Sequence, residues 1–405
     1  MPAGSWGSNS LLVIASSARA LAASGRRSGY EIAALDLFGD EDLAEVAVAF
    51  ERVTRARTGG FKSRDLIAAA NRVAPAFGKP RGGFVYGSGF EDRPELLAEL
   101  AKGRRLLGNS PNVIARCKNP VGFSAILGEL GLRHPEIRLE RPQQLDGWLV
   151  KRTGGSGGIH IHAARNSRPN SKIYYQRLVA GTPISALVLA NGCEAKILGL
   201  SEQWTAPSSA TPFRFGGATA PAALGAALQR QIADAALQLA QRLELVGLTS
   251  VDFIADIPRG EFSVIEVNPR PGATLEVYER LLGVSLLDLH VRACCGEMPP
   301  IGVARGRLRA VASVILYTKE ETIFPPGFPW PEWAADRPKA RTRIKTEEPI
   351  CTVFGEGPTA QDARRAAHAR SKALRVAIEQ CMQSCFARAP SLREKGGTTV
   401  RKRES

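Results

Sequence analysis

This chain has no long apolar run and no Cys-x-x-Cys motif. No apolar stretch in its 405 residues approaches the roughly 20 residues that a membrane-spanning helix needs. The early apolar run Leu11–Ala15 is too short for the core of a signal peptide, and no basic segment precedes it. Cys381 and Cys385 fall four apart on a predicted helix, where packing is a better interpretation than metal binding. We therefore expect a cytoplasmic protein with reduced thiols and no membrane segment.

Clustered positive charge is also scarce, although the chain as a whole is strongly basic. The formal net charge is +15, but the arginines are spread along the sequence. The one basic run, 393–403, belongs to a segment, 391–405, that we expect to be a disordered tail. Aromatic residues do not alternate with basic ones, as they do on surfaces that bind single strands. Nucleic acid is therefore not an expected partner, and the charge favours a small anionic ligand.

The first 105 residues lack the glycine fingerprint of a dinucleotide site. No Gly-x-Gly-x-x-Gly follows their first predicted strand, at 10–15. A second strand is expected at 31–36 and a third from Gly83, with helices at 17–27 and 41–50 between them. Strands that alternate with helices predict a parallel sheet, so residues 1–105 should form an α/β domain.

Two further domains are predicted after residue 105. Residues 106–300 combine short alternating strands with long helices, which favours a mixed α+β module. A subdomain at about 140–185 should carry a glycine-rich hairpin. Residues 301–390 are expected to form an α/β lobe that ends in a long helix at 359–386.

Two carboxylates and an amide fall in a predicted β-hairpin. Apolar runs on both sides of Pro258-Arg259-Gly260 predict two antiparallel strands. With Arg259 at the centre, Asp252 faces Glu266, and Asn268 lies on the same face because side chains alternate along a strand. Both acids stand within apolar runs, where unpaired charge is costly, so solvated strand acids are the weaker interpretation. Hard oxygen ligands of this kind suit Mg²⁺, with Mn²⁺ as an alternative.

A glycine-rich loop follows Lys151 and separates two predicted strands. It comprises Gly154, Gly155, Ser156, Gly157 and Gly158. Its Gly-x-Ser-x-Gly pattern matches the nucleophile elbow of serine hydrolases, but an elbow requires a helix after the turn, and here a strand is predicted. The backbone N–H groups of such a hairpin can close over phosphates. We therefore predict a phosphate flap with Lys151 at its base.

Two other features allow more than one interpretation. His160 and His162 alternate with apolar residues, which predicts that both point to one face of a strand. They could ligate a metal, but no third ligand is evident, so a partly exposed strand face is preferred. Arg214 is either a contact for a substrate anion or a loop arginine.

Taken together, Lys151, the glycine loop, Asp252 and the run Glu266-x-Asn268-x-Arg270 resemble the ATP-grasp superfamily. The resemblance covers most of the chain. It extends to biotin carboxylase, to carbamoyl phosphate synthetase modules and to carboligase-like members. It implies a domain that precedes the ATP-grasp module, a split ATP-grasp module and a C-terminal lobe. It also implies that Asp252, Glu266 and Asn268 hold Mg²⁺ ions that bridge the phosphates of ATP.

The resemblance further implies a set of nucleotide contacts. Lys118 is similar to the first ATP-binding lysine of the family, and Lys151 to the second. The run Gln176-Arg177-Leu178 resembles the hinge whose backbone pairs with adenine, although Arg177 stands where an acidic residue is often found. Arg270 resembles the arginine that steadies a substrate carboxylate or a developing acyl phosphate.

The reaction that this resemblance implies is an ATP- and Mg²⁺-dependent ligation. A small carboxylate is activated as an acyl phosphate, and an amine then attacks it, with Arg270 and Lys151 as catalytic residues. One candidate is the joining of glutamate to tyramine or tyrosine for a methanofuran-type, one-carbon cofactor. The alternatives are a carboxylase like biotin carboxylase and an ATP-binding protein without catalysis. A homodimer is compatible with each.

Overall fold

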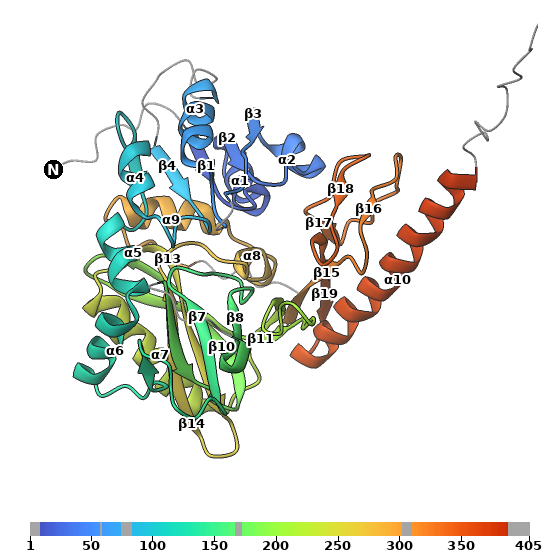
Figure 1. Ribbon diagram of the computed structural model, residues 1–405. Helices are drawn as coiled ribbons and strands as arrows, with labels where there is room; N and C mark the ends of the chain where they lie inside the picture. The colour runs from blue at the N-terminus through green and yellow to red at the C-terminus, as the bar shows by residue number, and fades with distance from the viewer. Residues whose placement is uncertain (1–8, 57–58, 74–82, 167–171, 302–309, 388–405) are drawn as a thin grey trace, which may run out of the picture.

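The computed structural model describes residues 9–56, 59–73, 83–166, 172–301 and 310–387. Most of the N-terminal part is a parallel α/β unit (Figure 1). Its five strands run in the order β3-β2-β1-β4-β5, with helices between them. The strands are β1 (Ser10–Ile14), β2 (Glu31–Asp36), β3 (Ala49–Arg52), β4 (Gly83–Tyr86) and β5 (Arg105–Leu107), and the helices are α1 (Arg19–Arg27), α2 (Glu41–Val46), α3 (Ser63–Val73) and α4 (Glu95–Leu100).

The predicted α/β class and parallel sheet are therefore confirmed, but one element differs. The helix expected at 41–50 ends at Val46, and the residues after it turn into β3. There Ala49 pairs with Ala33 of β2 in parallel register, so the short apolar run completes the sheet edge instead of extending the helix.

The central part is built on two antiparallel sheets. The larger one has eight strands in the order β14-β13-β10-β11-β12-β15-β19-β17, and the smaller has four in the order β6-β9-β7-β8. The strands of the larger sheet from this part are β10 (Thr182–Asn191), β11 (Ala195–Thr205), β12 (Phe215–Ala220), β13 (Val246–Asp256) and β14 (Glu261–Asn268). The smaller sheet comprises β6 (Ile137–Arg138), β7 (Trp148–Arg152), β8 (Ile161–Ala163) and β9 (Ile173–Arg177).

Helices accompany these sheets, and the two on either side of Asn119 begin at side-chain caps. Ser110 caps α5 (Pro111–Lys118), and Asn119 caps α6 (Pro120–Glu129), so the chain turns sharply just after Lys118. In Figure 1, α5, α6 and α7 (Ala226–Arg242) lie along the flank of the strands. This arrangement fixes Lys118 at a helix end that points toward β14, which α5 contacts.

The longer strands of the C-terminal part extend the large sheet. Strands β15 (Ala310–Tyr317) and β19 (Pro349–Gly357) continue it beyond β12, and β17 (Ala334–Ala335) closes its edge. A separate two-stranded sheet pairs β16 (Thr322–Ile323) with β18 (Arg343–Ile344). The long helix α10 (Ala360–Ala387) packs on β15 and β19, as predicted for 359–386. The predicted tail 391–405 lies outside the described residues.

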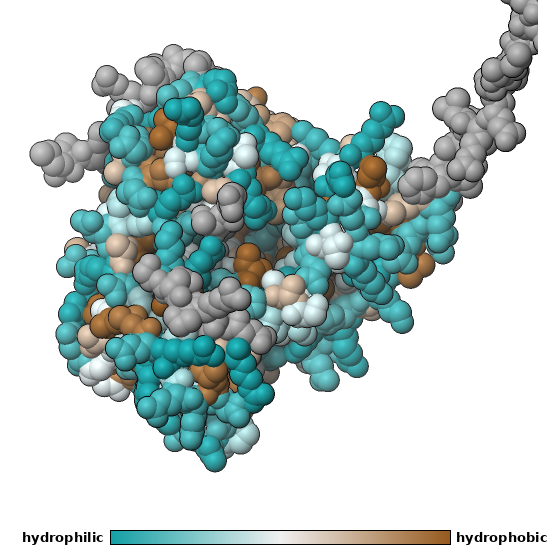
Figure 2. Space-filling view, in the orientation of Figure 1, coloured by the Kyte–Doolittle hydropathy of each residue, from teal (hydrophilic) through white to brown (hydrophobic). Residues whose placement is uncertain are grey.

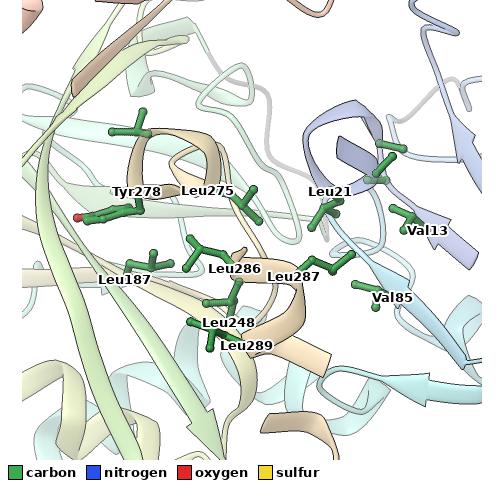
Figure 3. Packing of buried hydrophobic residues seen from close by; sticks show 14 of the residues in the cluster. Val13, Leu21, Val85, Leu187, Leu248, Leu275, Tyr278, Leu286, Leu287 and Leu289 are labelled. Carbon is green, nitrogen blue, oxygen red and sulfur yellow. The ribbon is translucent and has the colours of Figure 1, made fainter. Parts of the chain in front are cut away.

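One hydrophobic core joins the N-terminal sheet to the large sheet. Helices α8 (Leu275–Leu282) and α9 (Leu286–Cys294) lie between them, and Figure 3 shows Leu287 beside Leu21 and Val85, with Leu286 on the side of Leu187 and Leu275. Gly25 of α1 permits this approach, because a Cβ there would lie 2.8 Å from a methyl carbon of Leu287. The two parts are therefore held as one packed body.

The visible surface is mostly hydrophilic, with hydrophobic residues scattered over it (Figure 2). Among the described residues, no helix is long and apolar enough to cross a membrane. Free cysteines in the described part include the buried Cys117 and Cys351.

A buried histidine makes the stability of this fold sensitive to acid. His290 of α9 accepts a hydrogen bond from the Leu248 backbone N–H at Nδ1 (2.8 Å), so its Nε2–H faces the Leu107 carbonyl (3.1 Å). Burial lowers the pKa of His290 to about 4. Between the unfolded value, 6.5, and this value the unfolded chain binds more protons, so the free energy of unfolding should fall as the pH is lowered. The full loss should be roughly 3 kcal/mol.

This prediction is checked by urea denaturation at several pH values. His290→Gln keeps an amide N–H donor near the position of Nε2, which faces the Leu107 carbonyl, but cannot titrate. The difference in unfolding free energy between wild type and His290→Gln should therefore shrink as the pH falls from 7 to 4. A difference that stays constant over this range would show that His290 does not carry the acid sensitivity.

Candidate active site

The predicted carboxylate hairpin is present as β13 and β14. Asp252 pairs with Glu266 and Ser250 with Asn268 in antiparallel register, as the sequence predicted. The turn itself is not centred on Arg259, because Asp256 pairs with Glu261 and the register changes between Asp252 and Phe253. One residue of β14, Ile265, is left unpaired in this bulge. A bulge next to a site re-aims the neighbouring side chains, and here it brings Glu266 opposite Asp252.

The hairpin side chains form a hydrogen-bonded network. Asn268 donates its amide to Asp252 (2.8 Å), and its amide oxygen accepts from Lys118 Nζ (2.9 Å). Lys118 also lies 3.4 Å from a carboxylate oxygen of Glu266. Ser185 of β10 donates to the other oxygen of Asp252 (2.6 Å). The structure therefore brings together all three predicted metal ligands and the first predicted ATP lysine.

The electrostatics of this network favour a bound cation. Burial raises the pKa of Asp252, and the neighbouring Glu266 charge raises it further. Burial acts in the same direction on Glu266, but the charges of Lys118 and Lys151 outweigh it and lower its pKa. The positively charged Lys118 ammonium lies beside the Asn268 and Glu266 oxygens, as a metal ion would. Two carboxylates and an amide oxygen suit Mg²⁺, which takes its remaining ligands from water and phosphate.

No cluster of three or more histidine, cysteine or acidic side chains suited to a metal occurs in the described part of the chain. The side chains gathered at the hairpin, two carboxylates and an amide, offer oxygen atoms. These oxygen atoms suit a hard cation such as Mg²⁺, which takes its remaining ligands from water and phosphate, better than they suit zinc.

Lys151 reaches the same region from the smaller sheet. It is only 3% exposed, and burial lowers its pKa. Its ammonium donates to the side-chain oxygen of Gln176 (3.0 Å), across the β7–β9 pair. Lys151, which was predicted to bind phosphate, is thus hydrogen-bonded to Gln176, which was predicted to belong to the adenine hinge.

The predicted adenine hinge, Gln176-Arg177-Leu178, ends β9. The backbone N–H groups of Arg177 and Leu178 donate to the carbonyls of Glu136 and Gly147 (both 2.8 Å). The Arg177 guanidinium lies over Trp148, 5.5 Å from the ring centroid. Both N–H groups are therefore engaged within the protein. Among the described residues, the next N–H along the chain, that of Val179, donates to no carbonyl.

The glycine loop is a hairpin between paired strands. Leu149 of β7 pairs with Ala163 of β8, and no helix follows the turn, which excludes the nucleophile elbow. The loop lies against two other segments. An added Cβ at Gly154 would meet the backbone of Glu91 and Asp92, and one at Gly158 would meet the carbonyl of Phe213. The Phe215 N–H also donates to the Gly157 carbonyl (3.0 Å).

Alternation predicted that the two histidines after the loop share one face of a strand, but they do not. His160 lies in the turn before β8, and only His162 belongs to the strand, opposite Val150. His160 lines the cleft beneath the loop. The preferred interpretation, a partly exposed strand face, is therefore wrong for His160, because the strand expected from Ile159 begins two residues later, at Ile161.

Arg270 is held by a residue that the sequence did not reveal. Its Nε donates to Glu91 (2.9 Å), and both side chains are nearly buried. The second oxygen of Glu91 accepts from the N–H groups of Gly89 and Phe90 (2.7 and 3.0 Å). Arg270, Lys118 and these N–H groups together outweigh the effect of burial and lower the pKa of Glu91. The sequence did contain a signal for Glu91. It is an acidic residue just after the glycine turn that ends β4, and ligands bind at the carboxyl ends of parallel strands.

Arg214 makes contacts that are structural. Its guanidinium stacks on Tyr317, 3.7 Å from the ring centroid. It donates to the carbonyls of Ala206 (3.0 Å) and Glu347 (2.9 Å). These bonds tie the loop before β12 to the C-terminal segment, and that loop in turn touches the glycine hairpin at Gly158.

A cleft of about 520 Å³, including its open mouth, lies between α5, α6, β9, β14 and the glycine loop. Its lining includes apolar side chains, among them Phe123, Leu127 and Val264, and polar or charged ones, among them Lys118, Gln176 and Glu266. A ligand with a flat base and a phosphate chain needs both kinds of lining.

Comparison with known proteins agrees with this geometry. Residues 117–274 match the sequence profile of the ATP-grasp domain family. The carbamoyl phosphate synthase large chain of Rubrobacter xylanophilus is 26% identical over 243 residues, which cover 53% of this chain and 22% of that protein. The arginine-specific large chain of Bacillus subtilis is 26% identical over 215 residues, 48% of this chain and 20% of that protein. The chain thus matches about a fifth of the length of these relatives.

Solved structures share the fold across most of the chain. Rhizobium etli pyruvate carboxylase superposes with a TM-score of 0.69 at 15% identity. The superposed region covers 89% of this chain and 37% of the pyruvate carboxylase chain. The biotin carboxylase domain of Hydrogenobacter thermophilus 2-oxoglutarate carboxylase gives 0.67 at 15%, with 88% and 89% covered. Thermotoga maritima N5-carboxyaminoimidazole ribonucleotide synthetase gives 0.63 at 14%, with 90% and 98% covered.

The fold and the sequence profile define a class of ATP-dependent enzymes. Residues 117–274 are an ATP-grasp domain, and the chain is similar in sequence to carbamoyl phosphate synthetase large chains and in fold to biotin carboxylase domains and N5-carboxyaminoimidazole ribonucleotide synthetase. The predicted family and fold are confirmed.

The contact of the glycine loop with Phe213 gives a matched pair of variants. Gly157 and Gly158 both have positive φ (66° and 73°), so alanine strains the backbone equally at each. A Cβ at Gly157 meets nothing within 4 Å, whereas one at Gly158 collides with the Phe213 carbonyl. Gly158→Ala should therefore prevent closure of the loop and reduce ATP turnover at least tenfold more than Gly157→Ala does. Equal turnover in the two variants would show that closure onto Phe213 is not required.

Proposed function

We propose that this protein is an ATP- and Mg²⁺-dependent carboxylate–amine ligase that acts through an acyl phosphate and releases ADP and phosphate. The observation that carries the proposal is the single network that joins Lys118, Asn268, Asp252 and Glu266 beside the cleft. It supplies oxygen ligands for a cation and ammonium groups for phosphate, which is what phosphoryl transfer requires of a protein.

The nucleotide would lie in the cleft with its base against apolar lining residues. Because the N–H groups of Arg177 and Leu178 are engaged, we propose that adenine accepts from the Val179 N–H and donates to a hinge carbonyl. Lys118 and Lys151 would bind the phosphates, with backbone N–H groups of Gly154, Gly155, Ser156, Gly157 and Gly158 above them. When bound, Mg²⁺ would be held by Asp252, Glu266 and Asn268 and would neutralise phosphate charge.

Arg270 would then hold the acid. Its planar guanidinium can bind two oxygens of a carboxylate or acyl phosphate, and Glu91 fixes its orientation through Nε. Glu91 itself is fixed by two backbone N–H donors, so Arg270 is positioned before substrate arrives. The closed glycine loop would exclude water, which would otherwise hydrolyse the acyl phosphate. Arg214 would act indirectly, by holding the loop against which the flap closes.

Bicarbonate is a second candidate for the activated acid. The observation that favours it is the fold shared with biotin carboxylase domains, of which the Hydrogenobacter thermophilus domain was solved with MgADP and bicarbonate. The same groups would serve both reactions, because each activates an oxyanion with ATP. The difference lies in the size of the acid that Arg270 must accommodate.

A screen for ADP release distinguishes these proposals. Carboxylic acids are crossed with amines, including glutamate with tyramine or tyrosine, and bicarbonate is tested with the same amines. ADP release that needs both an organic acid and an amine supports the ligase, and release that needs bicarbonate supports the carboxylase. Binding of ATP with no ADP release under any pair would support a non-catalytic ATP-binding protein.

Substitution of Arg270 tests its proposed role. Arg270→Lys should lower turnover roughly 10²–10³-fold, about 3–4 kcal/mol, because lysine cannot make the paired contact of a guanidinium. Lysine keeps the positive charge that buried Glu91 requires, so the fold should persist. ATP affinity, measured by calorimetry, should hardly change, because Lys118 and Lys151 carry it.

Arg259→Lys is the control, since Arg259 lies exposed at the turn of the same hairpin. It should match wild type in both turnover and ATP affinity. Arg270→Lys turnover equal to that of Arg259→Lys, or an equal loss of ATP affinity and turnover, would contradict the role of Arg270 as the clamp for the acid.

A further inference from the structure

One polar atom beside the cleft has no partner. The Nδ1 atom of His160 is shielded from solvent, and it makes no hydrogen bond within the part of the chain that the structure describes. Shielded polar atoms in folded proteins nearly always have a partner, so each exception calls for a ligand or another explanation.

The position of His160 indicates where that ligand would come from. Its ring lies against Gly155, in the space that a side chain at Gly155 would fill, with Nδ1 2.6 Å from the place of an added Cβ. The ring is therefore part of the closed glycine loop, on the side that lines the cleft with Lys118 and Gln176. The absent side chain at position 155 is what allows the ring to lie there.

The charges around His160 narrow the class of ligand. Burial lowers the pKa of His160 to about 4, and Lys151 and Lys118 lower it against the opposing charge of Glu266. The imidazole is thus neutral at neutral pH and carries one N–H. A neutral donor next to two phosphate-binding ammonium groups suits an anionic acceptor, and it adds no charge to a site that is already cationic.

We propose that His160 is a nucleotide contact whose Nδ1–H donates to a phosphate oxygen of ATP when the glycine loop closes. This rests on the proposed ATP site and adds a residue of the flap to it. The contact makes closure of the loop depend on the phosphate chain, so a ligand without phosphates would leave His160 unpaired.

The test compares His160→Phe with His162→Phe. His162 lies two residues further on, in β8, and does not line the cleft. Calorimetry with MgATP, ADP and adenosine gives the affinities. His160→Phe should weaken MgATP binding roughly tenfold and leave adenosine binding unchanged, because only the phosphate bond is lost. His162→Phe should match wild type with all three ligands.

Two further variants keep the test valid if phenylalanine disturbs the fold. His160→Asn places an amide N–H near the position of Nδ1, and His160→Gln places one near Nε2. MgATP affinity should be close to wild type in the asparagine variant and weakened in the glutamine variant. Thermal unfolding of each variant should stay near that of the wild type.

Three results would overturn the proposal while leaving the ATP site intact. These are unchanged MgATP affinity in His160→Phe, an equal loss of MgATP and adenosine affinity, and weaker binding in His160→Asn than in His160→Gln. Wild-type protein that binds neither MgATP nor ADP would instead contradict the proposed function, and the role of His160 with it.

Discussion

The whole candidate site depends on the matching of buried acidic oxygens with cations and N–H groups. Glu91 is matched by Arg270 and two backbone donors, and Asp252 by Ser185 and Asn268. Unmatched carboxylates in these positions would be strongly unfavourable, so each partner is fixed in place. The Glu91–Arg270 pair crosses between the N-terminal sheet and the hairpin, and beneath it α8 and α9 pack the same two parts together. The ion pair at the site and the apolar packing below it therefore both fix the position of the N-terminal sheet relative to the hairpin.

This geometry would organise the reaction in layers. The proposed metal ligands lie on the hairpin, the lysines come from α5 and β7, and the glycine loop lines the same cleft as Lys118 and Glu266. Its contacts at Glu91 and Phe213 place one end of the loop on the N-terminal part and the other near the segment held by Arg214. Closure over a nucleotide would therefore bring all three parts of the chain to the acid held by Arg270. Preorganisation of this kind, and not a nucleophilic side chain, is what acyl-phosphate chemistry demands.

Features that depend on neighbouring residues were predictable from the sequence. Alternation fixes which side chains of a strand share a face, so Glu266 and Asn268 were expected together, and the pairing of Asp252 with Glu266 is also confirmed. The turn centre was wrong, because the bulge at Ile265 adds one residue to β14, and nothing in the local pattern marks it. The early end of α2 has a similar cause, since pairing of Ala49 with β2 overrides helix propensity. Contacts between distant segments could not be predicted: Glu91 and Arg270 are 179 residues apart, and only the fold shows that His160 turns inward.

Transfer of oxygen from acid to phosphate is the most direct test of the proposed chemistry. With the acid and amine found by the ADP-release screen, the acid is labelled with ¹⁸O in its carboxyl group and the released phosphate is analysed by mass spectrometry. An acyl phosphate forms when a carboxylate oxygen bonds to the γ-phosphorus, and attack by the amine then leaves that oxygen on phosphate. The account predicts one ¹⁸O in each phosphate released. Phosphate without label, while amide product accumulates, would contradict it.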